Sequence, residues 1–243
     1  MKVIIAEDYT KQCSIAADIF EEIIRAKPDC CLGLATGSSP VGMYQELARR
    51  CREEGLDFSR VHSVNLDEYV GLEPTHDQSY RYFMDTNLFD HINIDKRNTY
   101  VAKGTGDVEA NLREFNAVLA NSDIDIQLLG VGGDGHIGFN EPGAAFELGT
   151  HCVDLTEETI EANKRFFASA DDVPRQAYTM GVQTIMLARR IVIVISGESK
   201  ADIVREAFFG PVTPRVPASI LQLHTDVSVV ADEAALSKCA DLL

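Results

Sequence analysis

The residues with the clearest chemical potential lie in one glycine-rich stretch, residues 126–142. Asp134, His136 and Glu141 follow an apolar run there and lie within eight positions of one another. Two carboxylates beside one imidazole can orient the ring and set its charge, which suits a site that transfers protons. The surrounding glycines let the backbone approach a ligand closely. The stretch therefore predicts a proton-transfer site just past a buried strand.

The same stretch also contains Gly130, Gly132 and Gly135 at the spacing of a dinucleotide-binding fingerprint. That fingerprint requires a helix to open at the third glycine, so that the helix N-terminus faces the pyrophosphate. Residues 136–143 are poor helix-opening sequence. We therefore expect no nucleotide cofactor.

A further carboxylate candidate is Asp67, which follows a strand predicted at residues 62–66. Its neighbour Glu68 is also acidic, and adjacent side chains of an extended chain point in different directions. We expect one carboxylate to be catalytic and the other structural. Taken alone, Asp67 is more often a helix cap or a turn residue than a catalytic group.

Groups that could hold an anion follow another predicted strand, residues 31–35. Ser39 is predicted to cap a helix whose first residue is Pro40. Backbone N–H groups, hydroxyls and a helix N-terminus together attract anions, although an ordinary capped turn fits equally well. The loop lacks the lysine of a Walker A motif. Its residues are Thr36, Gly37, Ser38 and Ser39.

Two cations could complete such an anion site. Lys200 lies in a strand-to-helix turn after a predicted strand at residues 191–195, where a solvated cap is the alternative reading. Arg165 lies on a polar helix predicted at residues 156–168. We expect residues 155–178, approximately, to form a mobile lid.

Strands and helices alternate along the chain, which predicts one doubly wound, mostly parallel, Rossmann-like α/β sheet with helices on both faces. The chain reads as a single domain, residues 1–243. The carboxyl ends of parallel strands meet at one edge, so the candidate loops should converge there. Strands are expected at residues 2–6, 31–35, 62–66, 98–101, 126–129, 191–195 and 227–231, and helices at 9–26, 40–51, 79–89, 108–120, 156–168 and from 233.

The composition of the chain excludes several classes of binding partner and cofactor. The net charge of −16 argues against nucleic acid and anionic membranes. The apolar start is too short for a signal peptide, and Arg189 and Arg190 interrupt the longest apolar stretch, so a cytoplasmic protein is expected. The six cysteines lack zinc-ribbon spacing, and only one histidine lies in the candidate loops, so we expect no metal. A serine-nucleophile elbow is absent. After these exclusions, the chemistry that fits the candidate residues is proton abstraction next to a carbonyl or imine of a phosphorylated small molecule.

Two long motifs resemble the glucosamine-6-phosphate deaminases. They are Asn65-Leu66-Asp67-Glu68-Tyr69-Val70-Gly71-Leu72 and Gly130-Val131-Gly132-Gly133-Asp134-Gly135-His136-Ile137-Gly138-Phe139-Asn140-Glu141-Pro142. Shorter matches extend the likeness over nearly the whole chain. The resemblance implies conversion of glucosamine 6-phosphate and water to fructose 6-phosphate and ammonia, with no metal or organic cofactor.

The resemblance also implies residue roles. His136 would move a proton at the ring oxygen to open the pyranose, with Asp134 and Glu141 setting its orientation and charge. Asp67 would take the C2 proton and return it at C1. The phosphate would be held by Thr36, Gly37, Ser38, Ser39, Arg165 and Lys200, and Arg165 lies in the segment that forms the family's mobile lid.

Two other readings stay open: a 6-phosphogluconolactonase-type hydrolase, which would lack the carboxylate at Asp67, and a sugar-phosphate sensor, which would normally carry a DNA-binding domain. Regulated deaminases bind N-acetylglucosamine 6-phosphate between subunits through serines, an arginine and a lysine. Here those positions read Ala144, Ala145, His151 and Val153. With a short tail after the last predicted helix as well, we expect no such activation and a monomer or small homo-oligomer.

Overall fold

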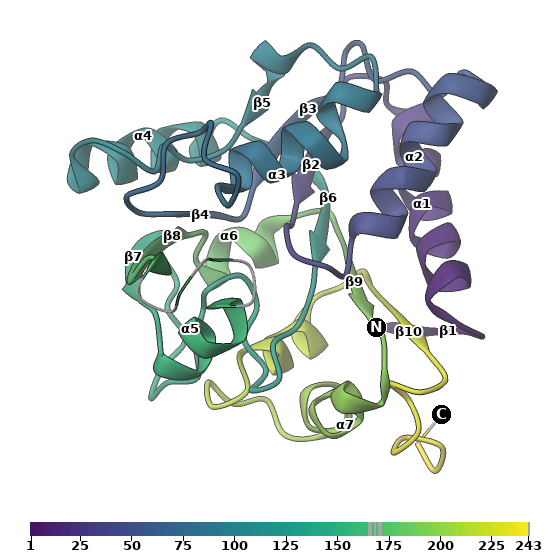
Figure 1. The fold of residues 1–243 in the computed structure, drawn as a ribbon. Helices are drawn as coiled ribbons and strands as arrows, with labels where there is room; N and C mark the ends of the chain where they lie inside the picture. Colours follow the sequence, from purple (N-terminus) through teal and green to yellow (C-terminus); the bar gives the residue numbers. More distant parts are fainter. Residues whose placement is uncertain (165–166, 168, 170–171, 243) are drawn as a thin grey trace.

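The computed structural model describes residues 1–164, 167, 169 and 172–242. Its centre is a sheet in which every neighbouring pair of strands is parallel (Figure 1). This confirms the expected α/β class. The strand order is β1 (Lys2–Ala6), β10 (Val227–Asp232), β9 (Arg190–Ile195), β6 (Ile124–Leu129), β2 (Cys31–Leu34), β3 (His62–Asn65) and β5 (Thr99–Tyr100).

Helices cover both faces of this sheet. Figure 1 shows α1 and α2 on one side and α7 with the 3₁₀ helix η6 on the other, so the sheet is doubly wound as expected. The α-helices are α1 (Tyr9–Ala26), α2 (Val41–Glu54), α3 (Tyr80–Asn87), α4 (Val108–Ala120), α5 (Glu157–Asn163), α6 (Val182–Leu187) and α7 (Ala201–Phe209). The 3₁₀ helices are η1 (Phe89–His91), η2 (Lys96–Asn98), η5 (Glu198–Lys200) and η6 (Pro217–Leu223).

Burial explains why these segments form strands and helices. The central strands β6, β9 and β10 are buried on both faces, which is why they are rich in apolar residues, most clearly β9 with the run Ile191–Ile195. Helix α1 is amphipathic and turns Phe20 and Ile24 toward the sheet. The Asp8 carboxylate accepts the Lys11 N–H at 2.7 Å and so caps the start of α1.

A second, antiparallel sheet corrects the expectation of a single sheet. It consists of β4 (Asp67–Tyr69), β8 (Gln176–Thr179) and β7 (His151–Asp154), in that order. These strands were not recognised from the sequence because they are short and mix polar with apolar residues, without an apolar run or a clear alternation. Asp67 pairs with Thr179 in this sheet, so the second sheet directly positions a candidate catalytic residue.

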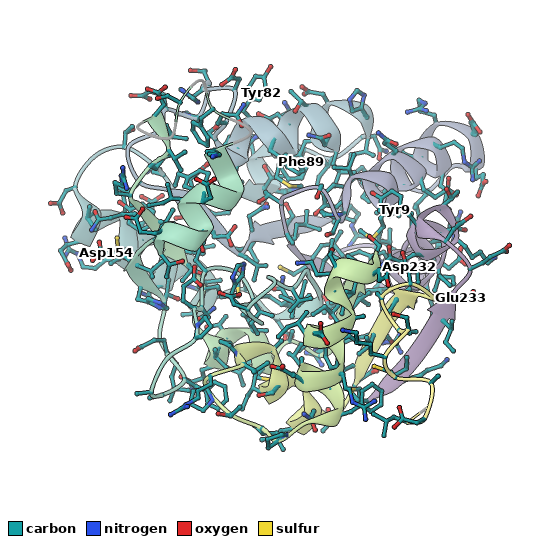
Figure 2. The ribbon with its side chains drawn as sticks, turned by 60° about the horizontal axis from the view of Figure 1, so that its bottom comes forward. Tyr9, Tyr82, Phe89, Asp154, Asp232 and Glu233 are labelled. Atoms are coloured by element: carbon teal, nitrogen blue, oxygen red, sulfur yellow. The ribbon has the colours of Figure 1, made fainter. Side chains whose placement is uncertain are left out.

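The predicted last helix is also wrong, because turns follow β10 instead. Figure 2 labels Asp232 and Glu233 at the end of the strand. The Asp232 carboxylate accepts the N–H of Ala235 at 2.8 Å and the N–H of Gly197 at 3.0 Å. The turns bury Ala235, Leu236 and Cys239 in the main core without a helix. Among the described helices, none is long and apolar enough to cross a membrane.

Candidate active site

A cavity of about 270 Å³ lies at the carboxyl edge of the main sheet, where the candidate loops converge. Predicted residues from four different loops line it: Thr36, Gly37, Ser38, Ser39, Asp67, His136 and Lys200. Asp134 and Glu141 lie behind His136 and contact its ring. Arg165 lies outside the described residues.

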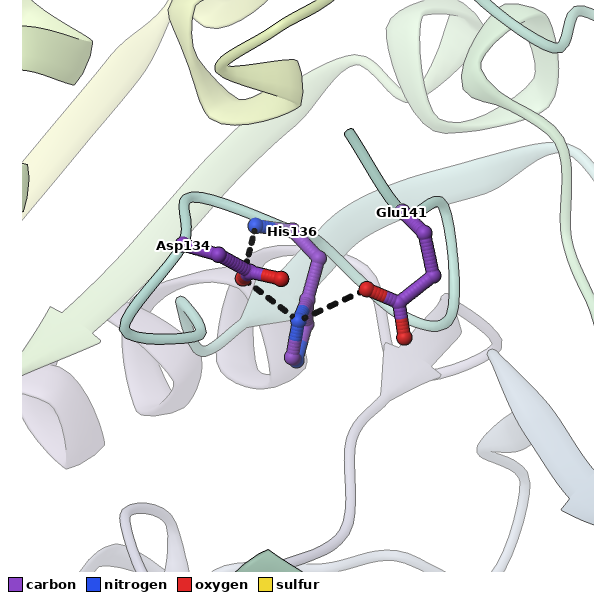
Figure 3. Close-up of side chains that lie close together, drawn as sticks. All are labelled: Asp134, His136 and Glu141. Atoms are coloured by element: carbon purple, nitrogen blue, oxygen red, sulfur yellow. Dashed lines mark hydrogen bonds and ion pairs between the residues drawn. The ribbon is translucent and has the colours of Figure 1, made fainter. Parts of the chain in front are cut away.

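Asp134, His136 and Glu141 form one charged cluster (Figure 3). The His136 Nδ1 atom lies 2.8 Å from Asp134 Oδ1 and 3.5 Å from Glu141 Oε2. The backbone N–H of His136 donates to the same Asp134 oxygen at 3.1 Å. Both carboxylates therefore approach the same ring nitrogen, which directs the opposite nitrogen of the ring away from them.

The charges of this cluster follow from its packing. Burial alone would lower the pKa of His136, but the two carboxylates outweigh it and raise that pKa to about 9. Burial would raise the pKa of Asp134, and the imidazolium instead holds it well below its usual range. His136 is therefore a cation at neutral pH, held between two acids.

The neighbours Asp67 and Glu68 have opposite environments, as the sequence suggested. Glu68 accepts the N–H groups of Tyr69, Tyr80 and Arg81 at 2.8, 2.9 and 3.0 Å, and so binds the first turn of α3. Among the described residues, none donates a hydrogen bond to the Asp67 carboxylate, which lines the cavity and is 6% exposed. Glu68 is thus the structural carboxylate, and Asp67 is the one presented to a ligand.

Desolvation dominates the ionisation of both groups. Burial, helped by the nearby Glu68 carboxylate, raises the pKa of Asp67 to about 8, although His136 acts in the opposite direction. Burial raises the pKa of Glu68 to about 7 despite its three N–H donors. A buried carboxylate with a raised pKa is a stronger base once ionised, which suits proton abstraction.

Glycines bring the backbone close to these side chains. Gly138 has φ of 60°, and a Cβ there would lie 2.9 Å from Thr179 Oγ1 and 3.5 Å from Asp67 Oδ2. A Cβ on Gly132 would lie 2.3 Å from the His136 ring. Residues 130–150 contain no helix, in agreement with the rejected nucleotide fingerprint.

The hydroxyl-rich loop, residues 36–39, is held in place by another contact than the predicted one. Helix α2 begins at Val41, its cap position is Pro40, and Ser39 makes no capping bond, so the prediction of Ser39 as the N-cap is wrong. Instead the Tyr9 hydroxyl accepts the Gly42 N–H at 3.0 Å and lies 3.2 and 3.3 Å from the carbonyl oxygens of Ser38 and Ser39. Tyr9, labelled in Figure 2 at the start of α1, thus replaces the cap and fixes the loop.

Lys200 reaches the cavity from the start of α7 and donates to the Val131 carbonyl at 2.8 Å. The lining residues that were not predicted as site residues include Tyr80, Phe139 and Thr159. The rings of Tyr80 and Phe139 stack with centroids 6.1 Å apart. Isolated aromatic residues in predicted helices or loops carry no signal of this role, and Thr159 lay inside the predicted lid helix.

The cluster of Asp134, His136 and Glu141 could also hold a metal ion, since three ligand atoms lie within 4.8 Å of one another. Counting imidazoles in the sequence did not find this set. An ion bound there would have to replace the Nδ1 proton that pairs with both acids. The expectation that no metal takes part stays a prediction.

A parallel sheet with a histidine–carboxylate cluster and a hydroxyl-rich loop beside one cavity at its carboxyl edge is the arrangement expected of an enzyme that acts on small phosphorylated molecules. Residues 7–230 match the family described as glucosamine-6-phosphate isomerases/6-phosphogluconolactonase, and the chain belongs to this family.

Relatives support this assignment over nearly the full length. A glucosamine-6-phosphate deaminase of Clostridium perfringens is 53% identical over 237 residues, covering 97% of this chain and 98% of that protein. The deaminase of Lachnoclostridium phytofermentans is 52% identical over 232 residues, covering 95% and 98%. The structure of a monomeric glucosamine-6-phosphate deaminase has a TM-score of 0.95 at 44% identity, covering 98% of this chain and 100% of that one. A 6-phosphogluconolactonase of Trypanosoma brucei (TM-score 0.77, 16% identity, 98% of each chain) shares the fold.

The raised pKa of Asp67 predicts a stability cost that depends on pH. In the unfolded chain this group ionises near pH 4, roughly, whereas the folded protein keeps its proton up to about pH 8. The folded state therefore binds one more proton between these values, and stability falls as pH rises through this window. Asp67→Asn should raise the melting temperature by about 3 °C or more at pH 7.5, with the gain shrinking toward pH 4.

Thermal unfolding of both proteins across this pH range measures the effect. Glu7→Gln, at an exposed position, is the control and should leave the melting temperature unchanged. An Asp67→Asn protein less stable than wild type at pH 7.5 would contradict the desolvation argument.

Proposed function

We propose that the chain converts glucosamine 6-phosphate and water into fructose 6-phosphate and ammonia. The observation that carries the proposal is the buried Asp67 carboxyl, placed in one cavity with His136 and the hydroxyl-rich loop. The named relatives above act as glucosamine-6-phosphate deaminases, and the lactone hydrolysis of the other branch needs no carbon base. Each reaction step has a group of this chain near it.

Ring opening comes first and falls to His136. Its imidazolium can protonate the ring oxygen of the pyranose, and the neutral imidazole so formed takes the proton of the anomeric hydroxyl, giving the open-chain aldehyde and restoring the imidazolium. Asp134 and Glu141 hold the ring in place and favour its charged form. The cluster therefore acts as a proton donor at neutral pH.

Isomerisation follows at Asp67. Its ionised carboxylate takes the C2 proton of the open-chain sugar, while the C1 carbonyl oxygen takes up a proton that the substrate's ammonium group releases, which gives an enolamine. C1 then accepts the proton back from the same carboxyl group as the nitrogen lone pair forms the C2–N double bond. The product carries an iminium at C2, to which water adds, and ammonia leaves to give the ketose. Burial keeps bulk water from exchanging with the transferred proton during the step.

Phosphate binding is proposed for the loop of Thr36, Gly37, Ser38 and Ser39, which combines hydroxyls, backbone N–H groups and the N-terminus of α2. Lys200 also lines the cavity and adds a positive charge. Arg165 would reach in from the predicted lid segment, residues 155–178, of which α5 already closes one side of the cavity through Thr159. Similarity to a monomeric deaminase supports a monomer, and we propose that the protein acts in the cytoplasm.

The first functional prediction concerns Asp67→Asn. This change removes the proton acceptor and keeps the shape, so turnover should fall by roughly 100-fold or more, while glucosamine 6-phosphate still binds. Coupled detection of fructose 6-phosphate measures turnover, and calorimetry measures binding. Glu73→Gln, an exposed acid nearby, is the matched control.

Two further experiments, metal chelation and a lactone-hydrolysis assay, test the class of reaction. Wild-type activity should survive exhaustive chelation and desalting, and recovery only with an added divalent ion would show that the carboxylate–histidine cluster uses a metal. The same preparation should not hydrolyse 6-phosphogluconolactone. Lactone hydrolysis without ammonia release would overturn the proposed function.

The second functional prediction is the pH dependence of kcat/KM, which reports groups of the free enzyme. Activity should rise as Asp67 ionises near its pKa of about 8 and fall as His136 loses its proton near about 9. The optimum should therefore lie between these values. Titration of the substrate's amine and phosphate by NMR separates their contribution, and a profile that is flat below pH 8 contradicts the assignment of Asp67.

The third functional prediction concerns regulation. Ala144 and Ala145 are exposed and offer no hydroxyl, and Val153 packs against the second apolar cluster instead of carrying a charge. An anionic phosphate is not held tightly without charge-assisted donors. We expect hyperbolic kinetics and no activation by millimolar N-acetylglucosamine 6-phosphate. Initial rates with and without this sugar check it, and a sigmoidal curve made hyperbolic by the sugar would reveal an effector site.

A further inference from the structure

The hydroxyl of Thr159 lies between the predicted lid and the catalytic cluster. Thr159 Oγ1 donates to Glu141 Oε1 at 2.7 Å, and the other oxygen of Glu141 lies 3.5 Å from His136 Nδ1. Thr159 is only 5% exposed and lines the cavity. A single short contact therefore connects helix α5 to the acid that orients His136.

The hydrogen bonds have a consistent direction along this path. The Thr156 hydroxyl donates to Thr159 Oγ1 at 3.0 Å and accepts the Thr159 N–H at 3.2 Å, which caps α5. Since a hydroxyl has one proton, Thr159 receives from Thr156 and gives its own proton to Glu141. The cap of α5, the Glu141 carboxylate and His136 thus form one continuous path.

Apolar packing places α5 where this bond can form. Ile160, next to Thr159, is buried in a second cluster with Tyr69, Phe139 and Leu155. This cluster is separate from the main core and lies around the short antiparallel sheet. If α5 moves, Ile160 leaves this cluster and the Thr159 hydroxyl leaves Glu141 at the same time.

Glu141 depends on this donor because it is itself buried, with its side chain 9% exposed. A buried carboxylate that loses its hydrogen-bond donor either takes a proton or turns toward another partner. Either change weakens the negative charge that faces His136 Nδ1. The consequence is a lower proton affinity of the imidazole.

We propose that Thr159 is a positioning residue that couples the docking of α5 to the charge and orientation of His136. Seating α5 over the cavity completes the proton donor for ring opening. When α5 is displaced, Glu141 loses its donor and His136 becomes a weaker cation. The proposal deepens the proposed function and rests on it for the catalytic consequence alone, since the coupling itself requires no substrate.

The test compares Thr159→Val, which removes the hydroxyl from a side chain of the same shape, with Thr159→Ser, which keeps it. In Thr159→Val the pKa of His136 should fall toward its ordinary value of about 6.5, and kcat should fall by about tenfold with KM changed less than about twofold, since an orienting interaction for the chemical step is lost. Thr159→Ser should restore both. Thr184→Val, a threonine on α6 outside the cavity, is the control.

NMR titration measures the pKa of His136 from its ring signals, which are assigned by their absence from the spectrum of His136→Gln. A double-mutant cycle with Glu141→Gln provides the second readout: if Thr159 acts through Glu141, Thr159→Val has little further effect in that background. By reciprocity, Glu141→Gln should speed hydrogen exchange of the α5 amides more than that of the α1 amides.

The outcomes separate the two proposals. An unchanged His136 pKa in Thr159→Val, or an equal loss of activity in the Glu141→Gln background, would mean that Thr159 only packs, and the inference fails. If Thr159→Val lowers the pKa of His136 but the wild-type protein has no deaminase activity, the coupling holds and the proposed function is overturned. If Thr159→Val does not fold, Thr159→Ala removes the same hydroxyl with less crowding.

Discussion

The burial of the Asp67 carboxyl group without a hydrogen-bond donor is the constraint that the site is built around. Its neighbour Glu68 is buried as deeply but receives three backbone N–H groups, so its charge serves the first turn of α3. Desolvating an unpaired carboxylate is costly, and proteins tolerate it where a reaction needs a strong base. Two adjacent acids with the same burial therefore have different roles, because only one of them is solvated by the backbone.

The second sheet makes this arrangement possible. The chain leaves β3 of the parallel sheet at Asn65 and enters β4 two residues later, so Asp67 lies where the chain passes from one sheet to the other. Thr179, its partner in β8, also accepts the Phe139 N–H through its hydroxyl at 3.0 Å. Asp67, the proposed base, and the glycine loop that carries His136 are thereby held by the same short strand. Distances between them depend on backbone pairing, which is stiffer than a free loop.

Much of this could be predicted from the sequence because its signals are strong. Apolar runs such as residues 191–195 predict the strands of the main sheet, and amphipathic segments such as α1 predict the helices that pack on it. Because the carboxyl ends of parallel strands lie at one edge of a sheet, the convergence of the candidate loops can then be predicted as well. The short strands β7 and β8, the role of Tyr9 and the contact of Thr159 with Glu141 could not be predicted. They depend on segments far apart in the chain, 29 positions for Tyr9 with Ser38 and 18 for Thr159 with Glu141, and no local pattern records such contacts.

The fold alone does not select the reaction. A 6-phosphogluconolactonase with 16% identity superimposes with a TM-score of 0.77, so the same sheet supports hydrolysis of a lactone. What differs is the demand of the chemistry: a lactone needs only a water activated near its carbonyl, whereas moving a proton between two carbons needs a base shielded from solvent. In this chain the buried carboxyl group of Asp67, which lines the cavity, is the group that could meet the second demand. An isomerising deaminase can therefore arise on this scaffold when the first residue of β4 is an acid without a hydrogen-bond donor and the neighbouring strands hold it in place.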